Sequence, residues 1–173
     1  VPASGTYPRF GIGAEAGYST RIMMDDLYSA SAYCYAYGYL PGITLTQGLK
    51  LTARYQHQFK ADLRRENAIS VAPRGFENSS AEYVIRNFSY DHLKFTADYA
   101  IPLWFGDISF LSPVAYIKNF EITPHFDYTM FSLGKGLTDG GLFSAGASIV
   151  AKLANLLWIP YDCSIGITAS YNG

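Results

Sequence analysis

The residues that could do chemistry in this chain are charged and imidazole side chains spaced two or four apart along segments of alternating polarity. Lys94 and Asp98 lie in one such segment, and Glu121, His125 and Asp127 lie in another. Residues two apart on a β-strand share a face of the sheet. We therefore expect carboxylates, an amine and an imidazole to lie side by side, where they could form ion pairs, transfer protons or bind a metal.

The spacings that catalysis or a bound ion would need are absent. The sequence has no Cys-x-x-Cys, His-x-x-x-His, Gly-x-Ser-x-Gly or phosphate-loop motif. Gly11 and Gly13 form a Gly-x-Gly, but it lies within a predicted strand, where glycine relieves crowding. We expect no enzymatic activity, no catalytic residue, no cofactor and no metal site.

The elements that position these groups are predicted to be antiparallel strands, with no helical segment to cover either face. The 12 residues from Leu49 to Lys60 alternate between apolar and polar side chains, and the pattern recurs along the chain. Seven strands are expected, at about 8–20, 27–40, 43–59, 92–101, 114–131, 142–153 and 161–171. The fold class is therefore all-β.

The polarity of the two faces decides between a soluble and a membrane barrel. Enclosing Glu15, Arg54, Asp98, Glu121 and Lys152 in a dry core would cost several kcal/mol for each unpaired ion. A water-filled interior accepts these charges, and lipid accepts the apolar face. We predict an antiparallel transmembrane β-barrel in the bacterial outer membrane, a single domain over residues 1–173. The residues predicted to face the lumen are Arg54, Lys94, Asp98, Glu121 and His125.

The composition agrees with a membrane barrel. Hydrophobic residues make up 49% of the chain and charged residues only 16%, with 15 Tyr and 11 Phe suited to aromatic girdles. The net charge of −1 gives no support for a nucleic-acid partner. A tyrosine-rich soluble sandwich is the alternative. The tyrosine column at 33, 35, 37 and 39 could stack on sugars if it faced water, but we expect it to face lipid or pack on a neighbouring strand.

Loop lengths alternate between the two ends of the predicted strands. Pro41-Gly42 predicts a tight turn on the periplasmic side, whereas residues 60–80 form a long loop at the other end. The connections at 102–113 and 155–160 are aromatic and are expected at the inner interface of the outer membrane. Because bacterial barrels have an even strand count, at least one further strand is expected after Gly173, and more are possible before Val1.

Four short motifs follow one another in a recognisable order. Pro73-Arg74-Gly75-Phe76 lies in the long loop, and Asp98-Tyr99-Ala100-Ile101-Pro102 ends a strand. His125-Phe126-Asp127 and the small-residue strand 144–148 follow. Over residues 49–171 this order resembles the C-terminal barrel of the bacterial surface antigen superfamily, which includes outer-membrane protein assembly factors and two-partner secretion transporters.

The resemblance implies an inward-folding loop and part of a barrel of about sixteen strands. It places Arg74, Gly75 and Phe76 in the loop and makes Asp127 the partner of Arg74 on the inner wall. Three positions depart from the family pattern, which are Pro73, His125 and Thr129. An Arg–carboxylate bond in a confined lumen offsets part of the entropy lost when a long loop is ordered. The pair either braces the barrel or is needed for substrate passage or folding.

Three functions remain open at this point. The first is a Gram-negative translocation or outer-membrane protein assembly barrel, with membrane lipid and an unfolded polypeptide or periplasmic accessory domains as partners. The second is a barrel that anchors an upstream propeller or hydrolase domain to the membrane. The third is a soluble ligand-binding β-barrel.

Overall fold

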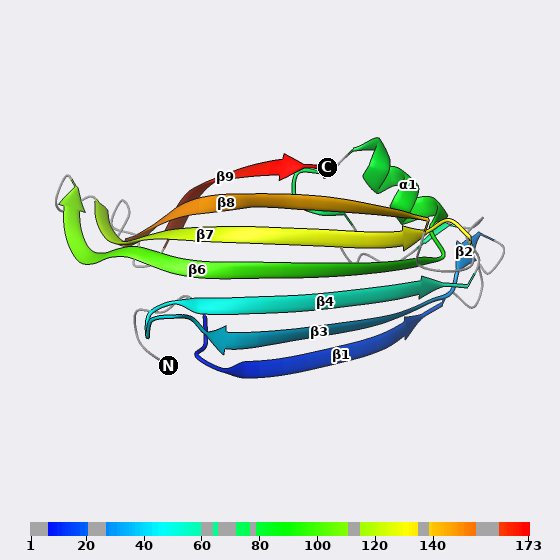
Figure 1. The fold of residues 1–173 in the computed structure, drawn as a ribbon, viewed down its shortest axis with the longest axis horizontal. Coiled ribbons are helices and arrows are strands. Elements are labelled where there is room, and N and C mark those ends of the chain that lie inside the picture. Colours follow the sequence, from blue (N-terminus) through cyan, green and yellow to red (C-terminus); the bar gives the residue numbers. More distant parts are fainter. Residues whose placement is uncertain are drawn as a thin grey trace.

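A computed structural model describes residues 7–20, 27–59, 64–65, 72–76, 79–110, 115–134, 139–154 and 163–173. Its main feature is a seven-stranded antiparallel sheet in the order β1-β3-β4-β6-β7-β8-β9 (Figure 1). The prediction of an all-β fold with seven antiparallel strands is confirmed. The elements are β1 (Gly11–Ser19), β2 (Tyr28–Ser29), β3 (Ser31–Pro41), β4 (Gly48–Gln58), β5 (Arg64–Arg65), α1 (Ser80–Phe88), β6 (Asp91–Phe110), β7 (Ala115–Ser132), β8 (Gly140–Ala154) and β9 (Cys163–Asn172).

The sheet is open, with β1 and β9 as its two edges. They lie on opposite sides of the sheet and run in the same direction (Figure 1). Each edge strand has one side without a partner strand, among the residues that the structure describes. Closure into a barrel therefore does not occur within this sheet.

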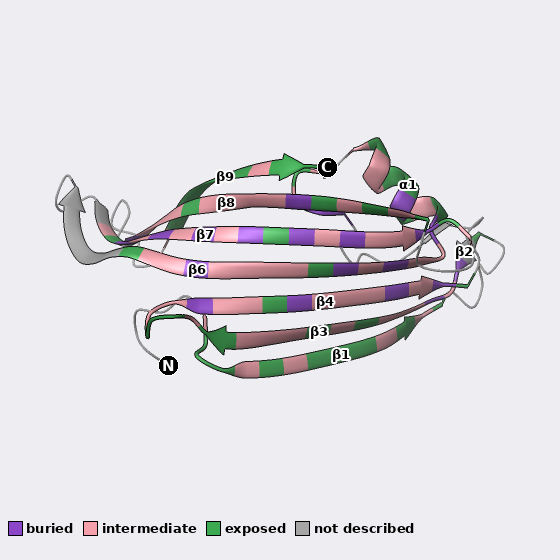
Figure 2. Cartoon of the chain, in the orientation of Figure 1, coloured by how far each residue is buried: buried purple, intermediate pink, exposed green. Residues whose placement is uncertain are grey.

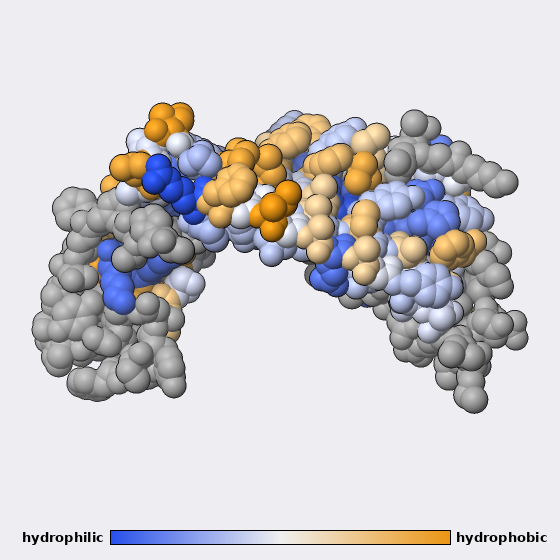
Figure 3. Space-filling view, turned by 90° about the horizontal axis from the view of Figure 1, so that it is seen from below, coloured by the Kyte–Doolittle hydropathy of each residue, from blue (hydrophilic) through white to orange (hydrophobic). Residues whose placement is uncertain are grey.

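The polarity of the sheet is inverted relative to that of a soluble protein. Leu51, Phe95 and Ile167 are 43%, 44% and 78% exposed, whereas Asp127 is fully buried. Buried positions recur at every second residue over much of β7 (Figure 2), and hydrophobic side chains gather on the convex surface (Figure 3). The buried polar residues on β4, β6 and β7 include Thr52, Gln56, Gln58, His92, Lys94, Asn119, Glu121, Thr123, His125, Asp127, Thr129 and Ser132. We call this side of the sheet the polar face and the other side the apolar face.

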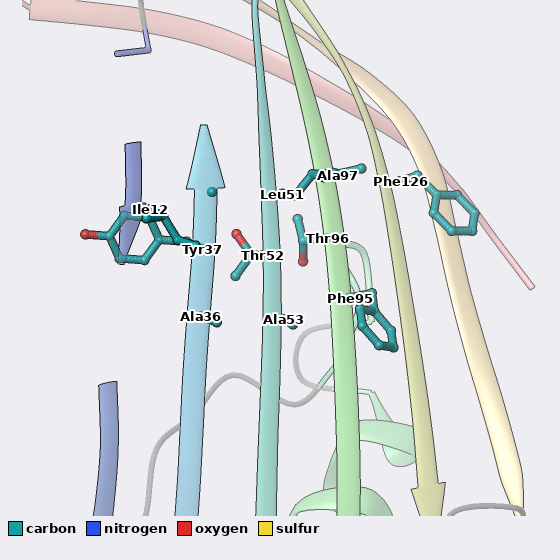
Figure 4. Close-up of a pocket in the computed structure, with 11 residues that line it drawn as sticks. Ile12, Ala36, Tyr37, Leu51, Thr52, Ala53, Phe95, Thr96, Ala97 and Phe126 are labelled. Carbon is teal, nitrogen blue, oxygen red and sulfur yellow. The ribbon is translucent and has the colours of Figure 1, made fainter. Parts of the chain in front are cut away.

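A shallow depression of about 430 Å³ lies in the apolar face across β1, β3, β4, β6 and β7 (Figure 4). Alanines line its central part, and larger side chains surround them. Its residues include Ile12, Ala36, Leu51, Ala53, Phe95, Ala97 and Phe126. The apolar face is therefore not flat, and no charged side chain lines this depression.

The tyrosine column of β3 lies on the polar face, not on the apolar face that was expected to meet lipid. Tyr35 pairs with Arg54 and Tyr37 with Thr52, and these β4 residues belong to the polar face. The alternative, packing on a neighbouring strand, is confirmed, because the Tyr37 ring occupies the space that a side chain at Gly13 would need. Glycines on β1 give the rings room, which explains why this face accepts them.

β6 extends farther than the sequence predicted. Residues 102–113 were expected to be a connection, but β6 continues to Phe110 and pairs with β7 from Ala115. Register shifts lie between Pro102 and Trp104 and between Phe105 and Ile108, so irregular pairing accommodates the proline. The other connection expected at the membrane interface, residues 155–160, lies outside the described residues.

Helix α1 was not predicted, although its start has a sequence signal. Ser79 caps the helix and accepts a hydrogen bond from the Glu82 N–H at 3.1 Å, which is the Ser-x-x-Glu spacing of a capping box. Ile85 is buried, and Arg86 lies in the last turn. The helix and the short parallel pair β2–β5 lie at the end of the sheet where β4 and β7 finish (Figure 1). No helix among the described residues is long and apolar enough to cross a membrane.

Gly146 on β8 is expected to tolerate no side chain. A Cβ there would overlap the Ala169 carbonyl oxygen of β9, and backbone has little freedom to move away. We expect Gly146→Ala to destabilise the protein by about 1–3 kcal/mol, as overpacking does in other proteins. Equilibrium unfolding and amide exchange along β9 would measure this effect. Ala147→Val, on the apolar face, is the control and should change stability little.

Candidate functional site

Residues 72–76 lie against the polar face. Within this turn the Phe76 N–H donates to the Pro73 carbonyl oxygen at 3.2 Å. Gly75 has a φ of 85°, a conformation that side chains disfavour. Ala72 and Pro73 are buried, so the turn is held in place by the sheet beneath it.

Arg74 pairs with Asp127 through both its backbone and its guanidinium. The backbone N–H donates to Asp127 Oδ2 at 3.0 Å, Nε lies 3.1 Å from the same oxygen, and Nη2 donates to Oδ1 at 3.2 Å. The Asp127 side chain is fully buried and that of Arg74 is 30% exposed. Charge-assisted bonds of this geometry are among the strongest in proteins.

A second carboxylate and a lysine complete the site. Arg74 Nη2 also donates to Asp98 Oδ1, and Lys94 Nζ donates to the Ala72 carbonyl oxygen. The strand register places Asp98 opposite His125, so Asp98 and Asp127 lie diagonally across β6 and β7. Two cations and two carboxylates balance one another here. We call Arg74, Lys94, Asp98 and Asp127 the loop-anchoring cluster.

The other residues predicted to face the lumen lie on the polar face outside this cluster. His125 Nε2 lies 3.0 Å from Ser170 Oγ of β9, across the space left by Gly146. Glu121 is buried and pairs with Lys152 at 3.5 Å. Arg54 lies over the Tyr35 ring, 5.1 Å from its centroid. These three residues belong to the polar face, and none of the interactions just described involves residues 72–76.

Two residues that belong to this region were not predicted from the sequence. Asn172 of β9 lies close to Gly75, and Tyr7 packs on Tyr39 with ring centroids 5.7 Å apart. Burial, and then the carboxylates of Asp98 and Glu121, raise the pKa of Tyr7 to about 12. Tyr7 therefore stays a neutral phenol at physiological pH. Asn172 lies in a regular strand and Tyr7 precedes the first one, so neither stands out in the pattern.

The bonds of the loop-anchoring cluster join residues 72–74 to strands β6 and β7. Among the described residues, no group of three or more His, Cys, Asp or Glu side chains could hold a metal ion. The guanidinium, the amine and the carboxylates of the cluster all bond within it or to the Ala72 carbonyl. Comparisons with protein-family models, curated proteins and solved structures find no match.

Gly75 offers a test of how tightly the turn is held. Gly75→Ala is expected to cost about 1–2 kcal/mol, because φ is positive there. A Cβ would also lie 2.5 Å from Asn172 Nδ2, which is a second source of strain. The rate of proteolysis between residues 72 and 79 should rise. The double variant Gly75→Ala/Asn172→Ala removes the steric part only, so complete recovery in it would contradict a backbone cause.

Proposed function

We propose that this chain forms part of the wall of an outer-membrane β-barrel of the surface antigen type, with its polar face lining a water-filled interior. The observation that supports this most is the inverted polarity of the sheet. Phe95 and Ile167 are exposed on one face while Asp127 and Lys94 are buried on the other. Soluble monomers rarely expose apolar patches beyond a few hundred Å². Exposing this apolar face costs less free energy in lipid than in water.

The two open edges support a larger sheet. β1 and β9 run in the same direction, so pairing them directly would be parallel (Figure 1). An antiparallel barrel therefore requires an odd number of further strands between them. Those strands complete the hydrogen bonding that lipid cannot supply. This agrees with the larger barrel of about sixteen strands that the resemblance implies.

The loop-anchoring cluster supports the surface antigen type over other barrels. It places Arg74 on Asp127, the pair that the resemblance implies. On this proposal the barrel assists the translocation or the membrane assembly of an unfolded polypeptide and has no catalytic role. The anchored turn narrows the interior that the polypeptide would share.

A membrane-anchoring barrel is the second candidate, and the balance of charge in the cluster favours it. Arg74 bonds both Asp98 and Asp127, and with Lys94 the cluster holds two cations and two carboxylates, so its formal net charge is zero. A turn held by the barrel wall can serve as a permanent brace. In that case, domains outside this chain perform the activity.

Reconstitution tests the membrane location first. The chain should float with liposomes, resist extraction by carbonate, and migrate differently on electrophoresis before and after heating. A chain that stays monomeric and soluble without detergent would contradict the proposal and favour the soluble ligand-binding β-barrel. Release of a translocated polypeptide from liposomes that contain the full protein would then separate transport from anchoring.

A further inference from the structure

The tyrosine column on β3 forms a continuous aromatic strip on the polar face. Tyr35 and Tyr37 have ring centroids 5.5 Å apart, Tyr37 and Tyr39 5.6 Å, and Tyr39 and Tyr7 5.7 Å. Tyr33 extends the column by one position and donates to Glu15 at 2.9 Å. We call these five tyrosines the tyrosine strip. Its nearly constant spacing is a repeating feature that the loop-anchoring cluster does not use.

The rings of Tyr33 and Tyr37 lean from β3 over β1. The ring atoms of Tyr37 fill the space beside Gly13, and those of Tyr33 fill the space beside Gly17 (Figure 4 shows Tyr37 directed toward β1). The three tyrosines from 35 to 39 remain half-buried rather than fully buried. Tyr33 and Tyr37 therefore pack beside glycines of β1, while the tyrosines of β3 stay partly exposed on the polar face.

Two cations lie over the strip. Lys50 Nζ is 5.9 Å from the Tyr39 ring centroid, and the Arg54 guanidinium is 5.1 Å from that of Tyr35. Both come from β4, next to β3. Among the described residues no ion pair joins a carboxylate to either cation. In the strand register Asp98 is opposite Lys50, and Lys94 is opposite Arg54. The strip is thus an aromatic platform with two cations over its rings and one carboxylate, Glu15, at its Tyr33 end.

From this geometry we propose that the tyrosine strip binds an extended anionic oligosaccharide. The spacing of the rings is close to the length of one pyranose residue, so successive sugars can each lie against one ring. Apolar C–H faces of sugars pack on aromatic rings, whose hydroxyls hydrogen-bond at the rim. Carboxylate groups on the sugars pair with Lys50 and Arg54. An extended polypeptide fits less well, because its side chains on one face recur at about 6.6–6.8 Å.

This inference goes beyond the proposed function and rests on it in one respect, that water reaches the polar face. Calorimetric titration of the full chain in detergent with tetragalacturonate tests it, with maltotetraose and a tetraglutamate peptide as comparison ligands. Tetragalacturonate is expected to bind at least tenfold more tightly than either. Raising the salt concentration should weaken its binding. Equal or tighter binding of the peptide would overturn the proposal, as would the absence of saccharide binding.

Two kinds of variant locate the binding. Lys50→Gln/Arg54→Gln leaves every ring in place and should weaken tetragalacturonate binding at least tenfold. Tyr35→Leu should weaken it by a similar factor and should also reduce any binding of maltotetraose. Tyr128→Leu, on the apolar face, and Arg86→Gln, on α1, are matched controls that should bind as the wild type does.

Failure of this inference is distinguishable from failure of the proposed function. A chain that floats with liposomes and shifts on heating but binds no saccharide retains the barrel and loses the ligand. A saccharide bound equally well by the Lys50→Gln/Arg54→Gln variant lies elsewhere on the protein, which also overturns the assignment. Liposome flotation of each variant shows that loss of binding is not loss of folding.

Discussion

Replacing Arg74 with alanine is expected to destabilise the protein by about 3–5 kcal/mol and to release residues 72–76 from the sheet. The change leaves the fully buried Asp127 carboxylate without the guanidinium, retaining only the hydrogen bond from the backbone N–H. Asp98 loses the same partner. Breaking a buried pair by removing one member is costly, because the remaining charge stays desolvated. Urea unfolding in detergent and limited proteolysis of residues 72–79 would measure the two effects.

Three further variants make this result interpretable. Arg74→Lys keeps the charge but cannot bond through Nε and Nη2 together, so we expect a partial loss of stability. Arg86→Ala removes an exposed arginine of α1 and should change stability by less than about 0.5 kcal/mol. Arg74→Ala/Asp127→Asn removes the orphaned charge and should recover part of the loss. Wild-type stability and proteolysis in Arg74→Ala would show that the cluster does not hold the turn.

Phe95→Arg is expected to impair membrane insertion by about 2–4 kcal/mol, the cost of a cation on the lipid-facing side of a barrel near the bilayer midplane. Phe95 is 44% exposed on β6 and lies on the rim of the apolar depression (Figure 4). The residues opposite it on the neighbouring strands, Ala53 and Tyr128, are not acidic and would not pair with a cation there. The fraction of protein that floats with liposomes, followed against urea concentration, gives the loss of insertion free energy.

The matched control places the same charge on the other face. Thr168 of β9 is exposed on the polar face and pairs across the sheet with Ser148. Thr168→Arg should insert as the wild type does, because water reaches that face. If Phe95→Arg instead remains folded and becomes more soluble without detergent, the apolar face does not meet lipid, and the soluble barrel is the better hypothesis.

Much of the fold follows from the alternation of residues along the sequence. A period of two requires strands, and short connections between successive strands favour antiparallel neighbours. The pairing of Arg74 with Asp127 was expected only through a motif resemblance, since no local pattern relates residues 53 positions apart. Helix α1 was overlooked because only nine residues form it, although the Ser79–Glu82 capping signal was present.

The sequence by itself determined that this chain forms strands with one apolar and one polar side, because side chains must alternate across an extended backbone. It did not determine which side of β3 belongs to which face. Tyrosine is apolar in its ring and polar in its hydroxyl, so the column was compatible with either environment. Only the tertiary structure decided this, by pairing Tyr35 with Arg54 and placing the Tyr37 ring over Gly13. The balanced charges around Arg74 were likewise decided in three dimensions, where β6, β7 and a distant turn meet.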